Sequence, residues 1–131
     1  MEKRAKILLV DDDEDFVEAM KAILETRAYE VVIASNGDEG LQKAREEKPD
    51  LILLDVIMPV KDGFTAAEQM KKDPELSQIP TLMLTAFADK GAQSSIPVSR
   101  GFALETEDYI DKSVSTEELL ARVEKYLKKA G

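Results

Sequence analysis

The chain has 131 residues, which is enough for one globular domain and too few for two. It contains no Cys and no His, which excludes disulfides, thiolate or imidazole metal ligands and any phosphohistidine formed within the chain. Its 27 acidic and 18 basic residues give a formal net charge of −9, which disfavours direct contact with nucleic acid phosphates.

No apolar run approaches the roughly 20 residues that a membrane-spanning helix needs, and no signal peptide precedes the first apolar run. We therefore expect a cytoplasmic protein that does not contact membranes. Apolar residues make up 44% of the chain and charged residues 34%, a balance typical of a soluble globular domain. We expect a single domain over residues 1–131, ordered over about residues 5–129, with a short tail at 130–131.

Short apolar runs alternate with stretches of helical periodicity, as in proteins built from repeated strand–helix units. Four aliphatic residues in a row, at 7–10, predict a strand that is buried on both faces. The sequence predicts strands at 7–10, 29–34, 50–54, 79–84 and 108–110. A helix follows the first strand, with Phe16, Met20, Ile23, Leu24 and Arg27 on one stripe. Further helices are predicted at 38–47, from 62–63 to 73–74, and after the Ser115–Glu118 capping box.

The stretch at 88–106 has weak periodicity and contains Gly91, Pro97 and Gly101, which indicates a loop or a broken helix. The repeated strand–helix order predicts an α/β protein with the flavodoxin-like, doubly wound (βα)5 fold. Its sheet would be mainly parallel, with strand order 2-1-3-4-5 and right-handed crossovers.

Acidic residues follow two of the predicted strands. Asp11 and Asp12 follow the run at 7–10, and Asp55 follows the run at 50–54. The first and third strands are neighbours in the predicted order, so these carboxylates converge at the carboxyl edge of the sheet, where such folds bind ligands. Carboxylates placed together repel one another unless a cation or a proton intervenes, and a site with only oxygen ligands suits Mg²⁺. The sequence therefore predicts a metal-dependent acidic site.

Two more polar residues end predicted strands: Thr85 follows the run at 82–84, and Lys112 follows 109–111. Either residue alone is weak evidence, because Thr is common in strands and Lys is common on surfaces. Together with three carboxylates and a divalent cation, the ammonium brings the formal charge to zero, and the hydroxyl can donate to a phosphoryl oxygen. This set of groups suits phosphoryl transfer to a carboxylate.

Two other acidic motifs fit less well. The spacing Asp11-x-Asp13-x-Asp15 is similar to the start of an EF-hand loop, but Phe16 stands where Gly is needed and Ala22 where Glu is needed. Asp11-x-Asp13 is also similar to the motif of haloacid-dehalogenase phosphatases, but the next residues differ and the chain has no room for a cap. Asp13 and Asp15 are better explained as acids at the start of a helix.

Five motifs lie in order along the chain: Ile-Leu-Leu-Val-Asp-Asp at 7–12, Leu-Leu-Asp-Val-Ile-Met-Pro at 53–59, Asp-Gly-Phe at 62–64, Leu-Thr-Ala at 84–86 and Tyr-Ile-Asp-Lys at 109–112. Together they resemble the response-regulator receiver domain of two-component signalling, over the whole chain. The resemblance implies that Asp55 accepts a phosphoryl group from a phosphohistidine on a histidine kinase or a histidine phosphotransfer protein. It also implies that Asp12, Asp55 and the Ile57 carbonyl bind Mg²⁺, with Asp11 acting through a metal-bound water.

The same resemblance implies that Thr85 and Lys112 hold the phosphoryl oxygens, and that Tyr109 is a switch aromatic that changes rotamer with Thr85. The chain would be a signalling switch and not a metabolic enzyme, limited to self-phosphorylation from a donor and to autodephosphorylation. It would pass its signal to a downstream protein and not directly to nucleic acid.

One position departs from the family: Ser113 follows Lys112, where the family usually has Pro after a cis peptide bond. A cis bond before a non-proline residue costs about 3 kcal/mol, which favours a trans bond here and a displaced Lys112. Two alternatives to a phosphorylated receiver therefore stay open. One is a pseudo-receiver scaffold that keeps the fold without phosphorylation, and the other is a small aspartyl-phosphate phosphatase.

Overall fold

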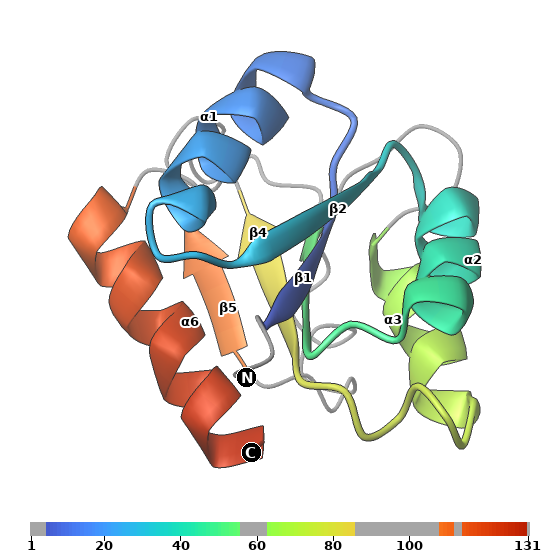
Figure 1. Ribbon diagram of the computed structural model, residues 1–131. Helices are drawn as coiled ribbons and strands as arrows, with labels where there is room; N and C mark the ends of the chain where they lie inside the picture. The colour runs from blue at the N-terminus through green and yellow to red at the C-terminus, as the bar shows by residue number, and fades with distance from the viewer. Residues whose placement is uncertain (1–4, 56–62, 86–107, 112–113, 131) are drawn as a thin grey trace.

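The computed structural model describes residues 5–55, 63–85, 108–111 and 114–130 (Figure 1). The predicted loop or broken helix at 88–106 lies outside these residues. The strands are β1 (Lys6–Val10), β2 (Glu30–Ala34), β3 (Leu51–Asp55), β4 (Thr81–Thr85) and β5 (Asp108–Asp111). The helices are α1 (Glu14–Glu25), α2 (Gly37–Glu47), α3 (Gly63–Lys72) and α6 (Thr116–Ala130).

The five strands form one parallel sheet in the order β2-β1-β3-β4-β5, which confirms the predicted flavodoxin-like topology. Helices α1 and α6 cover one face of this sheet, and α2 and α3 cover the other (Figure 1). Within the described part of the chain, no helix is both long and apolar enough to cross a membrane.

The central strands β1 and β3 are buried on both faces, as their unbroken apolar runs predict. Alternate side chains point to opposite layers: Leu8 and Ile52 pack in the layer of α2 and α3, whereas Leu9 and Leu53 pack in the layer of α1 and α6. All four of these side chains are fully buried, and burial of each contributes about 1.5–3 kcal/mol. The two strands that lead to Asp11 and Asp55 are therefore packed against helices on both faces of the sheet.

Side chains cap the starts of α1 and α6, and the cap of α6 is the one that the sequence predicts. Asp13 is the N-cap of α1, and its Oδ1 accepts the Phe16 N–H at 3.2 Å. The Ser115 hydroxyl oxygen likewise accepts the Glu118 N–H at 3.1 Å before α6. These bonds satisfy donors that a helix start leaves unpaired.

Some predicted boundaries are wrong. Arg27 does not belong to the stripe of α1: the Thr26 hydroxyl donates to the Ile23 carbonyl at 2.6 Å, and Ala28 takes a positive φ of 63°, so the helix ends at Glu25. β4 begins at Thr81 and not at 79, because the N–H of Ile79 donates to the Leu76 carbonyl in a turn. The predicted bounds of the 38–47 and 50–54 elements each differ by one residue from those of α2 and β3.

Lys6 joins β1 to the neighbouring elements at the amino edge of the sheet. Its Nζ lies 3.1 Å from Glu47 Oε1 and 3.8 Å from Glu30 Oε2, and its backbone N–H donates to Asp50 Oδ2 at 2.8 Å. The hydrogen bond to Glu47 raises the pKa of Lys6 above its ordinary value of 10.5, against an opposing effect of burial.

We expect Lys6→Met to lower the free energy of unfolding by about 0.5–1 kcal/mol at neutral pH, because the ion pairs are partly exposed. The pKa of Lys6 is raised in the folded state, so this contribution is present below pH 10.5 and is lost as the pH rises through the folded-state value. Urea denaturation should show the difference between wild type and variant shrinking above pH 10.5. Lys48→Met is the control, since Lys48 is exposed and forms no ion pair within the described residues. A difference that stayed constant at high pH would contradict this account.

Candidate functional site

Asp11, Asp12 and Asp55 lie together at the carboxyl edge of the sheet. One carboxylate oxygen from each residue lies within 4.8 Å of the others. Asp11 is only 2% exposed and Asp55 only 5%, whereas Asp12 is exposed. The predicted convergence of the three carboxylates is therefore present, with two of them inside the protein and one at its surface.

The register of the sheet produces this arrangement. Val10 of β1 pairs with Leu54 of β3, so the residues that follow them, Asp11 and Asp55, lie beside each other. The N–H of Asp11 donates to the Ala34 carbonyl at 3.0 Å, and the N–H of Asp13 donates to Asp11 Oδ1 at 3.0 Å. Backbone groups thus fix both the position of Asp11 and the orientation of its carboxylate.

The Ala34 carbonyl was not predicted from the sequence. It is a backbone group, and every residue type carries one, so only the pairing of β2 with β1 identifies it. This bond links the end of the edge strand to a buried residue of the site.

The donor set fits a hard divalent cation. Two nearly buried carboxylates and a third within 4.8 Å repel one another strongly, and burial adds the cost of removing charge from water. All three side chains offer oxygen, which Mg²⁺ prefers, and Mg²⁺ typically takes one or two carboxylates while keeping several waters. The residues present are therefore able to hold Mg²⁺.

The other predicted site residues are placed only in part. The backbone of Thr85 ends β4 and pairs with Asp111, while its neighbour Leu84 pairs with Asp55. Tyr109 lies within β5 and pairs with Met83. The strand end that bears Thr85 is thus adjacent to the one that bears Asp55. Ile57, Lys112 and Ser113 lie outside the described residues, so their predicted roles stay predictions.

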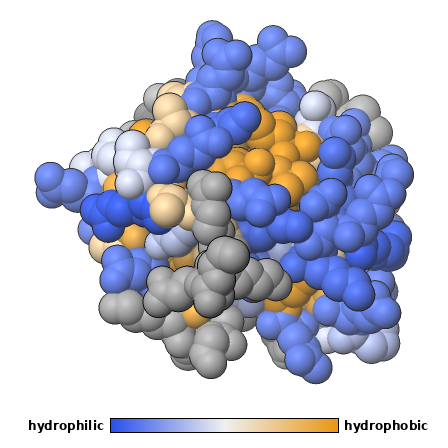
Figure 2. All heavy atoms as spheres, viewed as in Figure 1, coloured by the Kyte–Doolittle hydropathy of each residue, from blue (hydrophilic) through white to orange (hydrophobic). Residues whose placement is uncertain are grey.

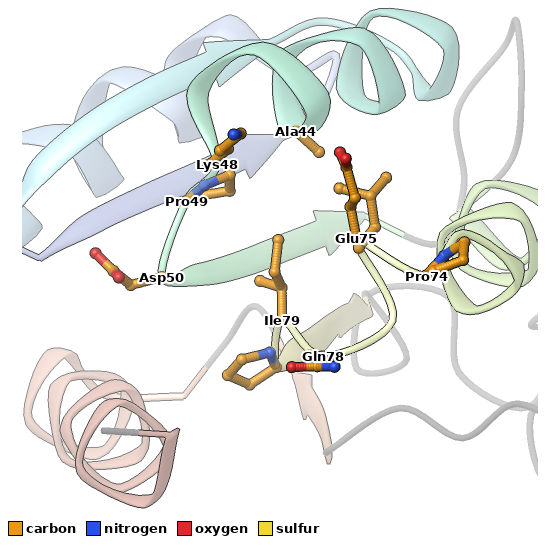
Figure 3. Close-up of a pocket in the computed structure, with 10 residues that line it drawn as sticks. Ala44, Lys48, Pro49, Asp50, Pro74, Glu75, Gln78 and Ile79 are labelled. Atoms are coloured by element: carbon orange, nitrogen blue, oxygen red, sulfur yellow. The ribbon is translucent and has the colours of Figure 1, made fainter.

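A hollow of about 540 Å³ lies at the opposite edge of the sheet, between the end of α2 and the connection from α3 to β4 (Figure 3). It adjoins the starts of β3 and β4, whereas the carboxylates lie where strands end. The hollow therefore takes no part in chemistry at the acidic cluster. Its lining residues are Ala44, Lys48, Pro49, Asp50, Pro74, Glu75, Leu76, Gln78, Ile79 and Pro80.

The fold and the site together define the class of this protein, which is a doubly wound α/β domain with a carboxylate site at the carboxyl edge of its sheet. The model of the response regulator receiver domain matches residues 7–124. The chain therefore belongs to the response regulator receiver domain family, as its motifs predicted. Receiver domains are signalling switches of two-component systems.

Individual relatives agree with this assignment. The chain is 39% identical over 125 residues to the alkaline phosphatase synthesis transcriptional regulatory protein PhoP of Bacillus subtilis, a match that covers 95% of the chain and 49% of PhoP. It is 37% identical over 119 residues to protein PilH of Pseudomonas aeruginosa, covering 91% of the chain and 94% of PilH. The chain thus spans about half the length of several curated relatives, among them PhoP, and nearly the full length of PilH.

Solved structures show the same fold. A CheY-like response regulator receiver domain protein from Methanospirillum hungatei superposes with a TM-score of 0.85 at 27% identity, covering 98% of this chain and 97% of that one. The receiver domain of the sensor histidine kinase PA1611 from Pseudomonas aeruginosa superposes with a TM-score of 0.83 at 25% identity, covering 96% of this chain and 99% of that one. The PA1611 structure has a magnesium ion coordinated in its active site cleft.

Proposed function

We propose that this chain is one receiver domain that accepts a phosphoryl group on Asp55 from a phosphohistidine of another protein. The observation that supports this most directly is the position of Asp55, nearly buried at the end of β3 and within 4.8 Å of two other carboxylates. An ionised carboxylate needs no separate general base to act as a nucleophile, and this is the role proposed for Asp55. These 131 residues contain no His, so the proposed phosphohistidine donor lies outside them.

The transfer is a displacement at phosphorus. A carboxylate oxygen of Asp55 forms a bond to phosphorus while the bond from phosphorus to the donor imidazole breaks, and the electron pair of that bond returns to the imidazole nitrogen. Asp11 and Asp12 would hold Mg²⁺ together with Asp55, in line with the ion in the PA1611 receiver. The cation, when bound, supplies positive charge that offsets the charge of the phosphoryl oxygens. Thr85 and Lys112 would contact the same oxygens, as family membership implies.

One experiment separates this proposal from its two alternatives. Intact mass is measured after incubation with acetyl phosphate and Mg²⁺, and again with the metal chelated. A receiver should gain one phosphoryl group per chain only when Mg²⁺ is present. The absence of an adduct under both conditions would favour a pseudo-receiver scaffold. Continuous turnover of a free phosphate ester with Mg²⁺ would favour a phosphatase.

Mg²⁺ should also stabilise the fold, since it binds the folded cluster and has no such site in the unfolded chain. At a concentration 100 times its Kd, the ion is expected to raise the free energy of unfolding by about 2.7 kcal/mol. Asp11→Asn should remove most of that increment, while making the metal-free fold slightly more stable because one repelling charge is gone. Urea denaturation with and without Mg²⁺ measures both effects.

Asp15→Asn is the matched control for the metal experiment. Asp15 is an exposed acid in the first turn of α1 and lies outside the cluster of three carboxylates. It should keep the full Mg²⁺ increment. An equal loss of the increment in both variants would show that the ion binds diffusely to the acidic surface and not at the cluster.

The output of the switch is proposed to be contact with a downstream protein. Phosphorylation adds charge at the sheet edge, and Thr85 and Tyr109 would respond by moving together, as the family implies. Several relatives of twice the length are named as transcriptional regulators, and one is named as DNA-binding. The present residues, with their net charge of −9, are expected not to contact nucleic acid themselves.

A further inference from the structure

β2 forms one edge of the sheet, and no other described strand pairs with its outer side. Its five residues pair with β1 alone, in an unbroken register from Lys6↔Glu30 to Val10↔Ala34. No described helix crosses the outer side of β2, which lies between α1 and α2 (Figure 1). The outward N–H and C=O groups of such a strand are able to pair with another strand.

The same strand is strongly apolar. Val31, Val32 and Ile33 are consecutive β-branched residues, and each is partly exposed. Figure 2 shows apolar atoms exposed on this face, with hydrophilic surface on either side. The strand contains no Pro and no Lys, and its regular register has no bulge, so three of the features that commonly protect an edge are missing from β2. Its one charged residue, Glu30, lies 3.8 Å from the ammonium of Lys6.

We propose that the β2 edge is a self-association surface, on which β2 of a second copy of this chain pairs antiparallel about Val32. In that register Val31 faces Ile33 of the second copy, and Glu30 faces Ala34, so no like charges meet. A two-fold axis relates the copies, and the assembly stops at two chains because each β2 edge is then occupied. Apolar cross-strand pairs of this kind are stabilising.

The other edge of the sheet does not suit the same pairing. β5 carries an acid at each end, Asp108 and Asp111, within only four residues. Antiparallel pairing of two β5 strands about their centre would set Asp108 of one copy against Asp111 of the other. Like charges directly opposite each other are destabilising, so the charge pattern selects β2 and not β5.

The dimer should be weak and should depend on salt. A five-residue strand buries little area, and two chains that each carry a net charge of −9 repel one another. Added salt screens this repulsion without weakening apolar contacts, so association should strengthen between low and physiological ionic strength. An interface built on ion pairs would show the opposite trend.

Sedimentation equilibrium over a wide concentration range tests the surface. We expect a monomer–dimer equilibrium that Ile33→Lys weakens by at least roughly tenfold, because a charge then lies in an apolar cross-strand pair. Ala121→Lys adds the same charge at an exposed position of α6 and should leave the equilibrium unchanged. A wild-type chain that remains monomeric at the highest concentration, or a dimer equally sensitive to both substitutions, would overturn the proposal.

Cross-linking tests the register and does not depend on the Lys variant. The chain has no Cys, so a single introduced thiol can pair only with its copy. Facing residues in an antiparallel pair have Cα atoms about 4.5–5.5 Å apart, which a disulfide can bridge, whereas the two copies of residue 30 would lie about 14 Å apart. Val32→Cys should therefore form disulfide dimers under mild oxidation, and Glu30→Cys should not. Equal cross-linking of the two variants would rule out this register.

Discussion

Asp55→Asn is expected to abolish the phosphoryl adduct completely. The neutral amide that replaces the carboxylate has no ionised oxygen to attack phosphorus, and no other described carboxylate lies both at the end of β3 and inside the protein. The substitution also removes one of three mutually repelling charges, so the metal-free variant should be more stable than wild type by on the order of 1 kcal/mol. Intact mass after acetyl phosphate treatment measures the first effect, and urea denaturation measures the second.

The same strand offers a matched control, because Asp50 immediately precedes β3 at its other end. Asp50 Oδ2 accepts the backbone N–H of Lys6 at 2.8 Å, so Asp50→Asn should cost about 1 kcal/mol of stability. It should still be phosphorylated fully, since it lies at the opposite edge of the sheet. An adduct of wild-type size on the Asp55→Asn chain would show that another residue is the acceptor.

The sheet and its acidic edge were predictable because apolar runs constrain the chain strongly. In a strand, four consecutive aliphatic residues, as at 7–10 and again at 51–54, can all be buried only when both faces of the sheet are covered. Once these two strands are neighbours, the residues that follow them must meet. The packing of the residues before Asp11 and Asp55 therefore brings these two side chains together. That packing is predictable because the apolar runs are visible in the sequence.

The details that were not predicted depend on backbone bonds between distant segments. The N–H of Asp11 donates to the Ala34 carbonyl, and the N–H of Ile52 donates to the Pro80 carbonyl at 2.9 Å. The residue types do not indicate such bonds, because every residue carries the same backbone carbonyl. The start of β4 at Thr81 differed from its predicted position for a local reason, because the N–H of Ile79 donates to the Leu76 carbonyl in a turn. The roles of Ile57, Thr85, Tyr109 and Lys112 follow from family resemblance and stay predictions.

Leu53→Ala should destabilise the fold by about 2–5 kcal/mol, more than any other substitution considered for stability. Leu53 is fully buried at the centre of β3, paired with Leu9 on one side and Leu82 on the other, so the neighbouring strands cannot close over the space left by the lost atoms. Leu127→Ala is the control of identical chemistry, because Leu127 is only partly buried on α6 and its loss should cost less.

The site should survive the Leu53 substitution even though stability falls. Leu53 faces the layer of α1 and α6, and β1 and β3 keep their register through the backbone, so the three carboxylates stay together. Mg²⁺ should therefore add the same increment to the free energy of unfolding of Leu53→Ala as to that of wild type. If the increment were lost along with the core contacts, the acidic cluster would depend on side-chain packing, and the strand register alone would not be sufficient to position it.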